Sequence, residues 1–423
     1  MAIQRKLSKK LKEQAKNRKI SILIGARQVG KTTILKELFE NLSRKGNKCL
    51  FLDVDILSNY EKISSFDNLL NLLRLNGYDE KQKEFFYLFI DEFQKYPLLT
   101  KIMKNSYDNI PNVKIYASGS SSLTIKDQVQ ESLAGRKIIN EMFPLDFEEF
   151  LIFKNKKRLA ENLKNIQKLK GDNLSSSLRE YRLLLEEYMI FGGYPEMALA
   201  GLKEEKIQVL SSIFDLYVKK DLVEHLNVDK ILNVKRLVEF LAVNSGQKIK
   251  YEELSKVSSL SFNEVKKYIE ILSETYIIRE IRPFFTNKNK ELVKIPKIYF
   301  LDNGVRNYFT NNFNELKLRD DSGFLFEGFI LAELIKEGVG NIKFWNDKNL
   351  EEIDFIKEEG GLLTPIEIKF KEILKSSDFS GLNSFLKSYK KIKKAYLISL
   401  NCQKKEKKVS LILPYLAGKE IHK

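Results

Sequence analysis

A nine-residue segment, GARQVGKTT at residues 25–33, limits the folds open to this chain more than any other part of its sequence. An apolar run, KISILIG at residues 19–25, precedes it and is typical of a buried strand. The residues that follow, TILKELFENLSRK, have the apolar spacing of a helix. The order strand, loop, helix around G-x-x-x-x-G-K-[ST] therefore predicts an α/β sheet whose phosphate-binding loop opens a helix.

Each residue type in this loop suits a nucleoside triphosphate. Glycines let the backbone N–H groups wrap the phosphates, Lys31 reaches the β- and γ-phosphates, and the Thr32 hydroxyl ligates Mg²⁺. We therefore expect ATP or GTP to bind here together with Mg²⁺. The predicted nucleotide-binding residues of the loop are Gly25, Ala26, Arg27, Gln28, Val29, Gly30, Lys31, Thr32 and Thr33.

A second apolar run, FFYLFIDE at residues 85–92, ends in two carboxylates. Asp91 is predicted to hold the Mg²⁺ through water, and Glu92 to polarise the attacking water as general base. An acidic helix cap after a strand is the alternative. A base directly after the metal aspartate favours hydrolysis over small-molecule phosphorylation.

Two further candidates follow along the chain. The segment VKIYASGSSSL at residues 113–123 predicts a strand beside the one that ends at Asp91, with Ser118 or Ser120 sensing the γ-phosphate. A plain Gly/Ser turn is the alternative reading of those serines. Arg136 follows a predicted helix and is a candidate arginine finger, in its own chain or in a neighbouring subunit of a homo-oligomer. The alternative for Arg136 is a surface salt bridge.

Five motifs in this order, GARQVGKTT, FIDEFQ, ASGSSSL, ESLAGR and FPLDFEEF, resemble the AAA+-like ATPases of archaea and bacteria that carry a conserved C-terminal region, the DUF4143-type ATPases. The resemblance covers nearly the whole chain. It implies a P-loop ATPase core at residues 1–150 and a helical lid at residues 151–228. In related ATPases a G-x-P-like turn of the lid touches the nucleotide, which implies this role for Gly193 and Pro195. A helix–helix turn is the alternative for the same residues.

The order of predicted elements in residues 229–310 is typical of a winged helix-turn-helix. Three helical segments are followed by two strand-like runs, YIIREIRPF and VKIPKIYFLD, with TNKNKE as the wing turn. Ser261 is a good N-cap for the third helix. That helix would present Asn263, Lys266 and Lys267 to DNA. Contact with another protein is the alternative.

The remaining region, residues 320–423, reads as a helix, three strands, a helix and two strands. Asp354 is expected on the strand next to Glu367, and Glu367 and Lys369 share a face because they are two residues apart. Such a group can hold Mg²⁺ and orient a water for phosphodiester attack, with Glu327 as a further ligand. It resembles the PD-(D/E)xK nuclease core, although Ile353 stands where the motif's proline would be. Related domains also keep the fold and bind DNA without cutting it.

The charge of the chain is compatible with a polyanionic partner. Lys and Arg number 73 and Asp and Glu 57, so the formal net charge is 73 − 57 = +16. Two lysine-rich segments, KSYKKIKK at 387–394 and CQKKEKK at 402–408, flank the nuclease-like residues. Trp345 and Tyr396 lie nearby, where core packing is favoured over base stacking. A lysine-rich proteome is the alternative source of the positive charge.

Other classes are excluded by composition. Two cysteines and two histidines do not make a disulfide framework, a four-thiolate zinc site or a histidine-based centre. The basic, amphipathic start and the lack of a long apolar run predict a cytoplasmic protein without a membrane segment.

The expected fold class is an α/β multidomain chain, with an AAA+-like P-loop core, a helical lid, a winged helix-turn-helix and a restriction-endonuclease-like α/β domain. The expected function is ATP-dependent remodelling or processing of DNA, branched DNA included. A nucleotide-controlled switch, or a transcription or defence regulator with a non-cutting nuclease fold, is the alternative. The predicted catalytic residues are Glu92, Arg136, Asp354, Glu367 and Lys369, and the predicted metal ligands are Thr32, Asp91, Glu327, Asp354 and Glu367.

Overall fold

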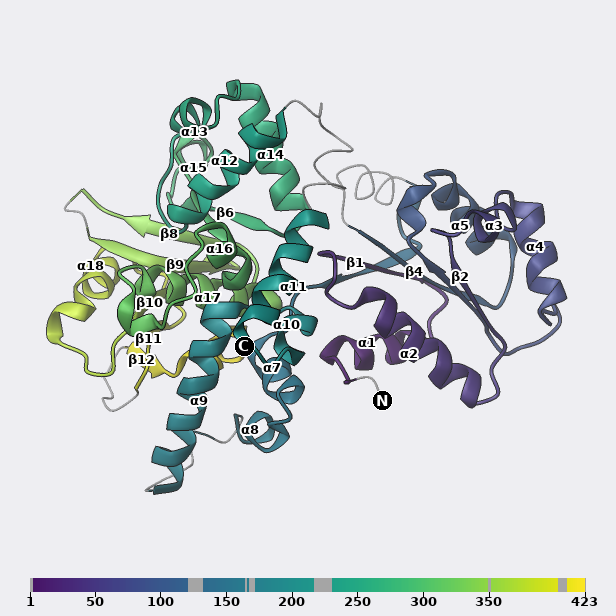
Figure 1. Cartoon of the computed structure of the whole chain (residues 1–423), viewed down its shortest axis with the longest axis horizontal. Coiled ribbons are helices and arrows are strands. Elements are labelled where there is room, and N and C mark those ends of the chain that lie inside the picture. Colours follow the sequence, from purple (N-terminus) through teal and green to yellow (C-terminus); the bar gives the residue numbers. More distant parts are fainter. Residues whose placement is uncertain are drawn as a thin grey trace. The chain divides into compact units, whose positions relative to one another are not determined.

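The computed structural model describes residues 3–120, 132–163, 166, 172–216, 230–348, 351–401 and 409–422. The chain divides into two compact units (Figure 1). Unit 1 contains Met1–Pro144 and Glu274–Tyr276, and unit 2 contains Leu145–Ser273 and Ile277–Lys423. The basic segment at 402–408 and the segment YVKKDLVEH at 217–225 lie outside the described residues.

Unit 1 is a three-layer α/β structure, as the sequence predicts. Its five strands have the order β2-β3-β4-β1-β5, and all neighbouring pairs are parallel. The two strands before the predicted phosphate and metal residues are buried at every position, because helices cover both faces of a parallel sheet. The elements are α1 Lys6–Gln14, β1 Ile20–Gly25, α2 Lys31–Arg44, β2 Cys49–Asp53, α3 Leu57–Glu61, α4 Phe66–Leu75, β3 Phe86–Asp91, η1 Phe93–Lys95, α5 Leu98–Asn109, β4 Val113–Ser120 and β5 Lys137–Met142.

Side chains that alternate along the strands form two cores. On one face, Phe39 of α2 packs edge-on against Phe89 of β3, with ring centroids 5.8 Å apart. On the other, strand residues such as Ile22 and Leu88 join Met103 of α5 in one apolar cluster. Burial on both faces fixes β3 beside β4 and brings the carboxyl ends of the strands to one edge.

Lys114 is buried at the amino end of β4. Its ammonium donates to the Ser21 hydroxyl at 2.7 Å and to the carbonyl oxygen of Lys19. Burial lowers the pKa of Lys114 from its ordinary 10.5 to about 7, because the charged form loses its hydration. The folded chain therefore prefers a neutral amine at this position.

This lowered pKa makes stability depend on pH. Between about pH 7 and pH 10.5 the unfolded chain holds a proton on Lys114 that the folded chain does not, so the free energy of unfolding rises with pH. Relative to Lys114→Met, the wild type should gain about 1.4 kcal/mol per pH unit across this window. Urea unfolding of both proteins, followed by circular dichroism at several pH values, measures the difference. Parallel curves would show that Lys114 keeps its proton when folded.

Unit 2 surrounds a larger, mixed sheet with helices. Its strands have the order β12-β11-β10-β9-β8-β6-β7. The elements are α7 Phe147–Phe153, α8 Lys157–Asn162, α9 Asp172–Phe191, α10 Pro195–Leu199, α11 Lys203–Leu216, α12 Ile231–Val243, α13 Tyr251–Ser258, α14 Phe262–Glu274, β6 Ile278–Pro283, α15 Lys288–Val293, β7 Lys297–Phe300, α16 Asn303–Phe309, η5 Leu316–Leu318, α17 Ser322–Lys336, β8 Ile342–Asn346, β9 Glu352–Glu359, β10 Leu362–Lys369, η6 Ser376–Phe379, α18 Ser380–Ser388, β11 Ala395–Ser399, β12 Val409–Ile412, η7 Pro414–Leu416 and α19 Ala417–His422.

The sheet joins two regions that the sequence predicts as separate domains. β6 and β7 form an antiparallel pair within the predicted winged helix. β6 also pairs in parallel with β8, through Arg282 opposite Lys343 and Pro283 opposite Phe344. The predicted boundary between residues 310 and 320 is therefore crossed by one continuous sheet. The sheet is continuous because the backbone N–H and C=O groups on the outer edge of β6 form hydrogen bonds with β8.

The predicted wing turn is also different in the structure. Most of TNKNKE forms the short helix α15 instead of an open turn. Asn287 caps this helix, since its side chain accepts a hydrogen bond from Asn289 N at 3.0 Å. Asparagine is a strong N-cap, and this local signal explains why a helix forms between the two strands.

The helices of the predicted lid belong to the compact body of unit 2. The carboxyl end of α9 is held by Asn307 of α16, whose amide donates to Ile190 O at 2.8 Å. The Gly192–Gly193 turn follows, and Asp302 accepts a hydrogen bond from Gly193 N at 2.7 Å. Among the helices that the structure describes, none is long and apolar enough to cross a membrane.

Candidate functional site

The phosphate loop connects β1 to α2 in unit 1, as predicted. Gly25 lies against the end of β5, and a Cβ at this position would be 2.0 Å from Met142 O. Gln28 and Gly30 have positive φ angles of 57° and 97°, which turn the loop into the first residue of the helix. No acidic side chain occupies the first turn of α2, so its N–H groups face outward without a competing charge.

Two basic side chains shape this loop. Lys31 donates to the carbonyl oxygens of Gly25 and Ala26 at 3.0 and 2.7 Å, which keeps its ammonium inside the loop. Arg5 donates to Val29 O at 2.9 Å and ties the loop to the amino-terminal segment. Arg5 belongs to no recognised motif, so this contact was not predicted. The position of Lys31 fits a group that neutralises phosphate charge.

Asp91 ends β3 and is buried beside β4. Its carboxylate accepts a hydrogen bond from the Ser118 hydroxyl of β4. The pairing of β3 with β4 was predicted and is confirmed by the register, which sets Ile90 opposite Ala117. Ser118 therefore holds the carboxylate in place. Of the two predicted serine sensors, it is the one that contacts the metal aspartate, and the side chain of Ser120 lies outside the described residues.

Glu92 begins the turn after β3 with a left-handed backbone, at φ 59°. Its carboxylate accepts a hydrogen bond from the Gln94 side-chain amide. Gln94 lies against Gly119 of β4, where an added Cβ would be 2.6 Å from the Gln94 side-chain oxygen. A left-handed glutamate is uncommon, and here it turns the carboxylate out of the strand. Sequence reasoning missed Gln94, although it is the third residue of the DEFQ run after Asp91.

The contacts of Arg136 do not support its predicted role as an arginine finger for the nucleotide site of its own chain. Its guanidinium donates to Asp108 at 2.7 Å, and this hydrogen bond raises the pKa of Arg136. Its carbonyl oxygen accepts from Ile20 N, at the amino end of β1. The phosphate loop follows the opposite end of the same strand, about 17 Å away at about 3.3 Å per residue. The salt-bridge alternative is the one that the contacts support, and a finger in a neighbouring subunit stays a prediction.

The residues of the loop and of β3 fit Mg²⁺ and a nucleoside triphosphate. A helix N-terminus opens on the loop, Lys31 supplies a fixed positive charge, and Thr32 stands on the first turn. Asp91 supplies a carboxylate at the carboxyl edge of the same sheet. With the metal bound, charge on the phosphates would be neutralised at this edge. Thr32 and Asp91 are the residues that would hold the metal.

Gly193 and Pro195, the predicted lid contact, pack within unit 2, and their contact with the nucleotide stays a prediction. Gly193 donates its N–H to Asp302, and its carbonyl oxygen accepts from Leu145 N at 2.7 Å. Pro195 occupies the first turn of α10, where its missing N–H costs nothing. Both backbone groups of Gly193 are therefore used by the fold. The helix–helix turn is the alternative that these contacts support.

The predicted DNA-contacting residues lie on α14 and are exposed. Asn263, Lys266 and Lys267 all face solvent, as the periodicity of the helix requires. Ser261 caps the helix as predicted, because the Glu264 carboxylate accepts from Ser261 N at 2.9 Å and Glu264 N donates back to the serine hydroxyl. Contact of this helix with DNA stays a prediction.

The nuclease-like residues come together in unit 2 as the sequence predicts. Asp354 of β9 lies beside β10, where its carboxylate accepts from Ile368 N at 2.7 Å. Glu367 and Lys369 form an ion pair of 2.5 Å. Glu327 of α17 accepts a hydrogen bond from Tyr299 of β7, a residue that the sequence did not single out.

A second lysine completes this carboxylate cluster. Lys297 of β7 lies 3.5 Å from Glu327 and 2.6 Å from Glu352. Burial raises the pKa of Glu327 and of Glu367, and neighbouring carboxylates add to the effect in each case. The lysines oppose this shift by stabilising the charged carboxylates. The cluster is thus a largely buried group of four carboxylates, those of Glu327, Glu352, Asp354 and Glu367, whose negative charge the two lysines offset only in part.

This cluster does not fit the predicted Mg²⁺ site. Across the described ranges, no group of three or more His, Cys, Asp or Glu side chains is arranged to hold a metal ion. The side chains of Glu327 and Glu367 are only 10% and 6% exposed, and each is paired within the protein. The physical reason is that Lys297 and Lys369 already pair with these carboxylates and supply part of the positive charge that a cation would bring.

Trp345 and Tyr396 are part of the core. Both are 5% exposed, so the predicted preference for core packing over base stacking is confirmed. Trp345 packs edge-on against Phe385 of α18, with ring centroids 5.1 Å apart. These contacts hold α18 on one face of the sheet.

Family models match three parts of the chain. Residues 17–151 match the model described as AAA domain, residues 182–316 match a domain of unknown function, DUF8612, and residues 322–416 match another, DUF4143. Among relatives, Uncharacterized protein MJ1544 of Methanocaldococcus jannaschii is 27% identical over 80% of this chain and 72% of its own length. An uncharacterized protein of Haemophilus influenzae is 24% identical over 88% of both chains.

A solved structure also resembles the chain. The Walker-type ATPase PABY2304 of Pyrococcus abyssi is 16% identical, covers 73% of this chain and 96% of its own, and has a TM-score of 0.46. The matched AAA model contains the phosphate loop, Asp91 and Glu92, and the DUF4143 model contains the carboxylate cluster. The chain therefore combines a region that matches an AAA domain with a region that matches DUF4143.

Proposed function

We propose that this protein hydrolyses ATP to remodel bound DNA, and that its DUF4143 region grips the DNA. The observation that carries the ATP-dependent part is the order of groups along one sheet edge. Lys31 follows β1, and Asp91 and Glu92 follow β3, with Ser118 fixing Asp91. In this arrangement phosphate binding and water activation are available in one unit.

Each of these groups has one task in hydrolysis. Lys31 and the N-terminus of α2 bind the β- and γ-phosphates. Glu92 accepts the proton of the attacking water, and Gln94 holds the Glu92 carboxylate by its amide until then. Because Gln94 sits against β4, a movement of that strand would change the position of the base.

The charge distribution supports DNA as partner. The formal net charge of +16 favours polyanions, and Lys266 and Lys267 are exposed on the face of α14 that the winged-helix prediction assigns to DNA. The lysine-rich segment at 387–394 adds a second basic surface in the same unit.

For the DUF4143 region we infer binding without cutting. The carboxylate cluster keeps the order of elements that the nuclease-like prediction requires, but Lys297 and Lys369 pair with Glu327 and Glu367, the carboxylates that a metal ion would need. The cutting hypothesis has one observation in its favour, which is that Asp354, Glu367 and Lys369 lie on neighbouring strands.

The test is ATP hydrolysis without DNA and with linear duplex, single-stranded and four-way-junction DNA, with strand cleavage scored in the same tubes with Mg²⁺. We expect hydrolysis that one DNA form stimulates, no cleavage, and no activity in Lys31→Ala. If the wild type cleaves DNA and both Asp354→Asn and Lys369→Ala abolish that cleavage, the DUF4143 region is a nuclease and not only a DNA-binding region.

A slow rate that no DNA changes would favour the nucleotide-controlled switch. In that case the exposed face of α14 would bind a protein instead of DNA. Affinity for DNA that is independent of salt would contradict the role of the basic surfaces.

A further inference from the structure

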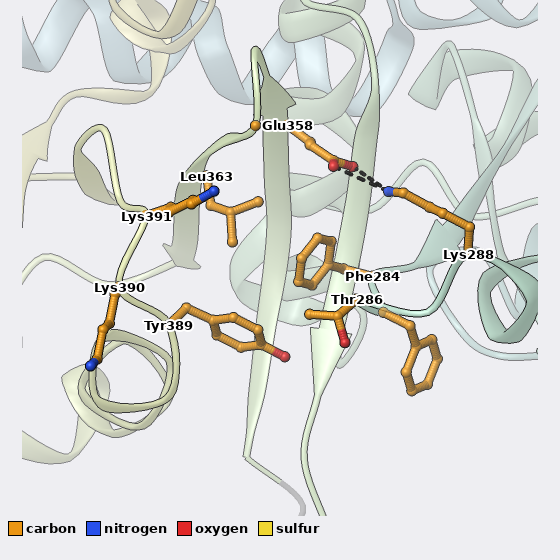
Figure 2. Close-up of a pocket in the computed structure, with 10 residues that line it drawn as sticks. Phe284, Thr286, Lys288, Glu358, Leu363, Tyr389, Lys390 and Lys391 are labelled. Carbon is orange, nitrogen blue, oxygen red and sulfur yellow. Dashed lines mark hydrogen bonds and ion pairs between the residues drawn. The ribbon is translucent and has the colours of Figure 1, made fainter.

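A cavity of about 270 Å³ lies in unit 2, where β6 and β9 end and β10 begins. Aromatic rings, lysine side chains and one carboxylate line it (Figure 2). Phe284 and Tyr389 contribute rings, and the turn after α18 contributes Lys390 and Lys391. None of the residues that sequence analysis selected as a site lines this cavity.

The rings form a rigid wall. Tyr389 and Phe284 have centroids 5.5 Å apart, and Tyr389 also lies 4.5 Å from Phe385 of the core. The Tyr389 hydroxyl accepts a hydrogen bond from Trp345 Nε1 at 3.2 Å. The rings of Tyr389 and Phe284 are tilted by 72° and Phe284 is buried, so a planar ligand can stack on Tyr389 with Phe284 beneath its edge, and core residues already hold both rings in place.

On one side of the cavity the charges cancel. Lys288 donates to Glu358 at 2.9 Å, and Lys343 donates to Glu358 at 2.6 Å and to Glu291 at 2.8 Å. Two lysines and two glutamates thus neutralise one another. The Glu358 carboxylate still faces the cavity as a hydrogen-bond acceptor (Figure 2).

On the other side the charge is uncompensated. The ammonium groups of Lys390 and Lys391 make no hydrogen bond or ion pair with any residue in the described part of the chain, and both side chains are exposed. The Lys391 side chain reaches toward Leu363, at the start of β10 (Figure 2). The cavity therefore offers an aromatic wall next to two free positive charges.

We propose that this cavity binds one unpaired nucleotide of a single-stranded nucleic acid, an inference that rests on the proposed DNA-binding function. The base would stack on Tyr389, with Phe284 at its edge, and the flanking phosphates would meet Lys390 and Lys391. Single-strand binding by other proteins combines the same two features, aromatic stacking and a basic track along the backbone.

Size and polarity select this ligand. Pockets for drug-sized molecules span roughly 300–1,000 Å³, so about 270 Å³ is room for one base and not for a stacked pair. A base in a duplex is stacked on its neighbours and cannot offer its face. The N–H groups of bases, including N3–H of thymine, can donate to the Glu358 carboxylate.

The cavity is a different place from the carboxylate cluster. Leu363 lies near the start of β10, and Lys369 is its last residue. Six residues of strand separate them by about 20 Å, at about 3.3 Å per residue. A strand held here would thus be bound at the end of β10 that is remote from Glu367 and Lys369.

Two double variants with the same change in net charge test the proposal. Lys390→Glu with Lys391→Glu reverses the lining lysines, and Lys387→Glu with Lys394→Glu reverses two exposed neighbours outside the lining. Affinity for a fluorescent oligothymidine, measured by anisotropy over a salt series, should fall at least about tenfold more in the first. In this first variant, the slope of log affinity against log salt should become less steep by about 1.4. Two phosphate contacts are lost, and each contributes about 0.7 to the slope for a single strand.

A second pair of variants tests the aromatic ring of Tyr389 without changing any charge. Tyr389→Leu should lose about fivefold or more in affinity for oligothymidine, while Tyr389→Phe keeps the ring and should bind like the wild type. Circular dichroism verifies that each variant is folded, because both changes remove the hydrogen bond from Trp345 Nε1 to the Tyr389 hydroxyl and so alter the fluorescence of Trp345 directly.

The outcomes separate this inference from the proposed function. Equal losses in the two charge-reversed variants, or a wild type that binds duplex but not oligothymidine, overturn the cavity and leave DNA binding intact. Tight binding of free thymidine monophosphate, with no gain for the oligonucleotide, also overturns it in favour of a mononucleotide site. A wild type that binds no nucleic acid overturns both.

Discussion

Glu92→Gln should bind ATP normally and hydrolyse it about 10²- to 10⁴-fold more slowly. The substitution keeps the size of the side chain and its place in the left-handed turn after β3. It removes the carboxylate that would accept the proton of water. Since Lys31 and the N-terminus of α2 are unchanged, phosphate binding should stay within a few fold. Single-turnover hydrolysis and the affinity for a fluorescent ATP analogue measure the two effects separately.

The matched control is Glu40→Gln, an exposed glutamate on α2 whose partner is Arg44 at 3.1 Å. An isolated ion pair of this kind contributes little, so hydrolysis and binding should both be unchanged. If Glu92→Gln turns ATP over at the wild-type rate, Glu92 is not the base. If it loses ATP binding as well, its role is to support the loop.

Gly304→Ala should destabilise unit 2 by about 3 kcal/mol, although alanine normally stabilises a helix relative to glycine. Gly304 lies in the first turn of α16, packed on the end of α9. An added Cβ would be 2.0 Å from Phe191 O and 2.4 Å from Phe191 C. Both atoms are backbone, so no side-chain rotation relieves the overlap. Urea unfolding followed by the fluorescence of Trp345 reports the stability of this unit.

Gly323→Ala is the control for this change. Gly323 is exposed in the first turn of α17, and an added Cβ would meet nothing within 4 Å. Here the ordinary preference of helices should apply, and the free energy of unfolding should rise by about 0.5–1 kcal/mol. If both variants change stability in the same direction, the close approach of α16 to α9 is not the determinant.

The sequence predicted those parts of the site that follow one another along the chain. The phosphate loop, the strand that ends at Asp91 and the strand that carries Ser118 were found because each combines an apolar run with polar residues at its end. In a parallel sheet the strand ends meet at one edge, so their proximity also followed. Asp354 was placed beside Glu367 by a different argument, the adjacency of two consecutive strand-like runs, and these strands pair antiparallel.

The sequence did not predict contacts between residues that are far apart along the chain. Asp302 satisfies the N–H of Gly193, and Lys297 compensates Glu327, across separations that no local pattern reports. For Arg136, the motif around it suggested a nucleotide role, but within its own chain its guanidinium pairs with Asp108, near the amino edge of the sheet. Such contacts depend on tertiary packing and not on spacing.

The pairing of β6 with β8 means that the boundary between two sequence families is not a boundary of folding. The DUF8612 match ends at residue 316 and the DUF4143 match begins at residue 322, but their strands share backbone hydrogen bonds, such as Phe284 N to Phe344 O at 2.6 Å. A DUF4143 segment moved alone into another protein would carry β8 with an unpaired edge, which invites aggregation. The two families are therefore expected to be inherited together, and a recombination between them to survive only where the recipient offers a matching strand.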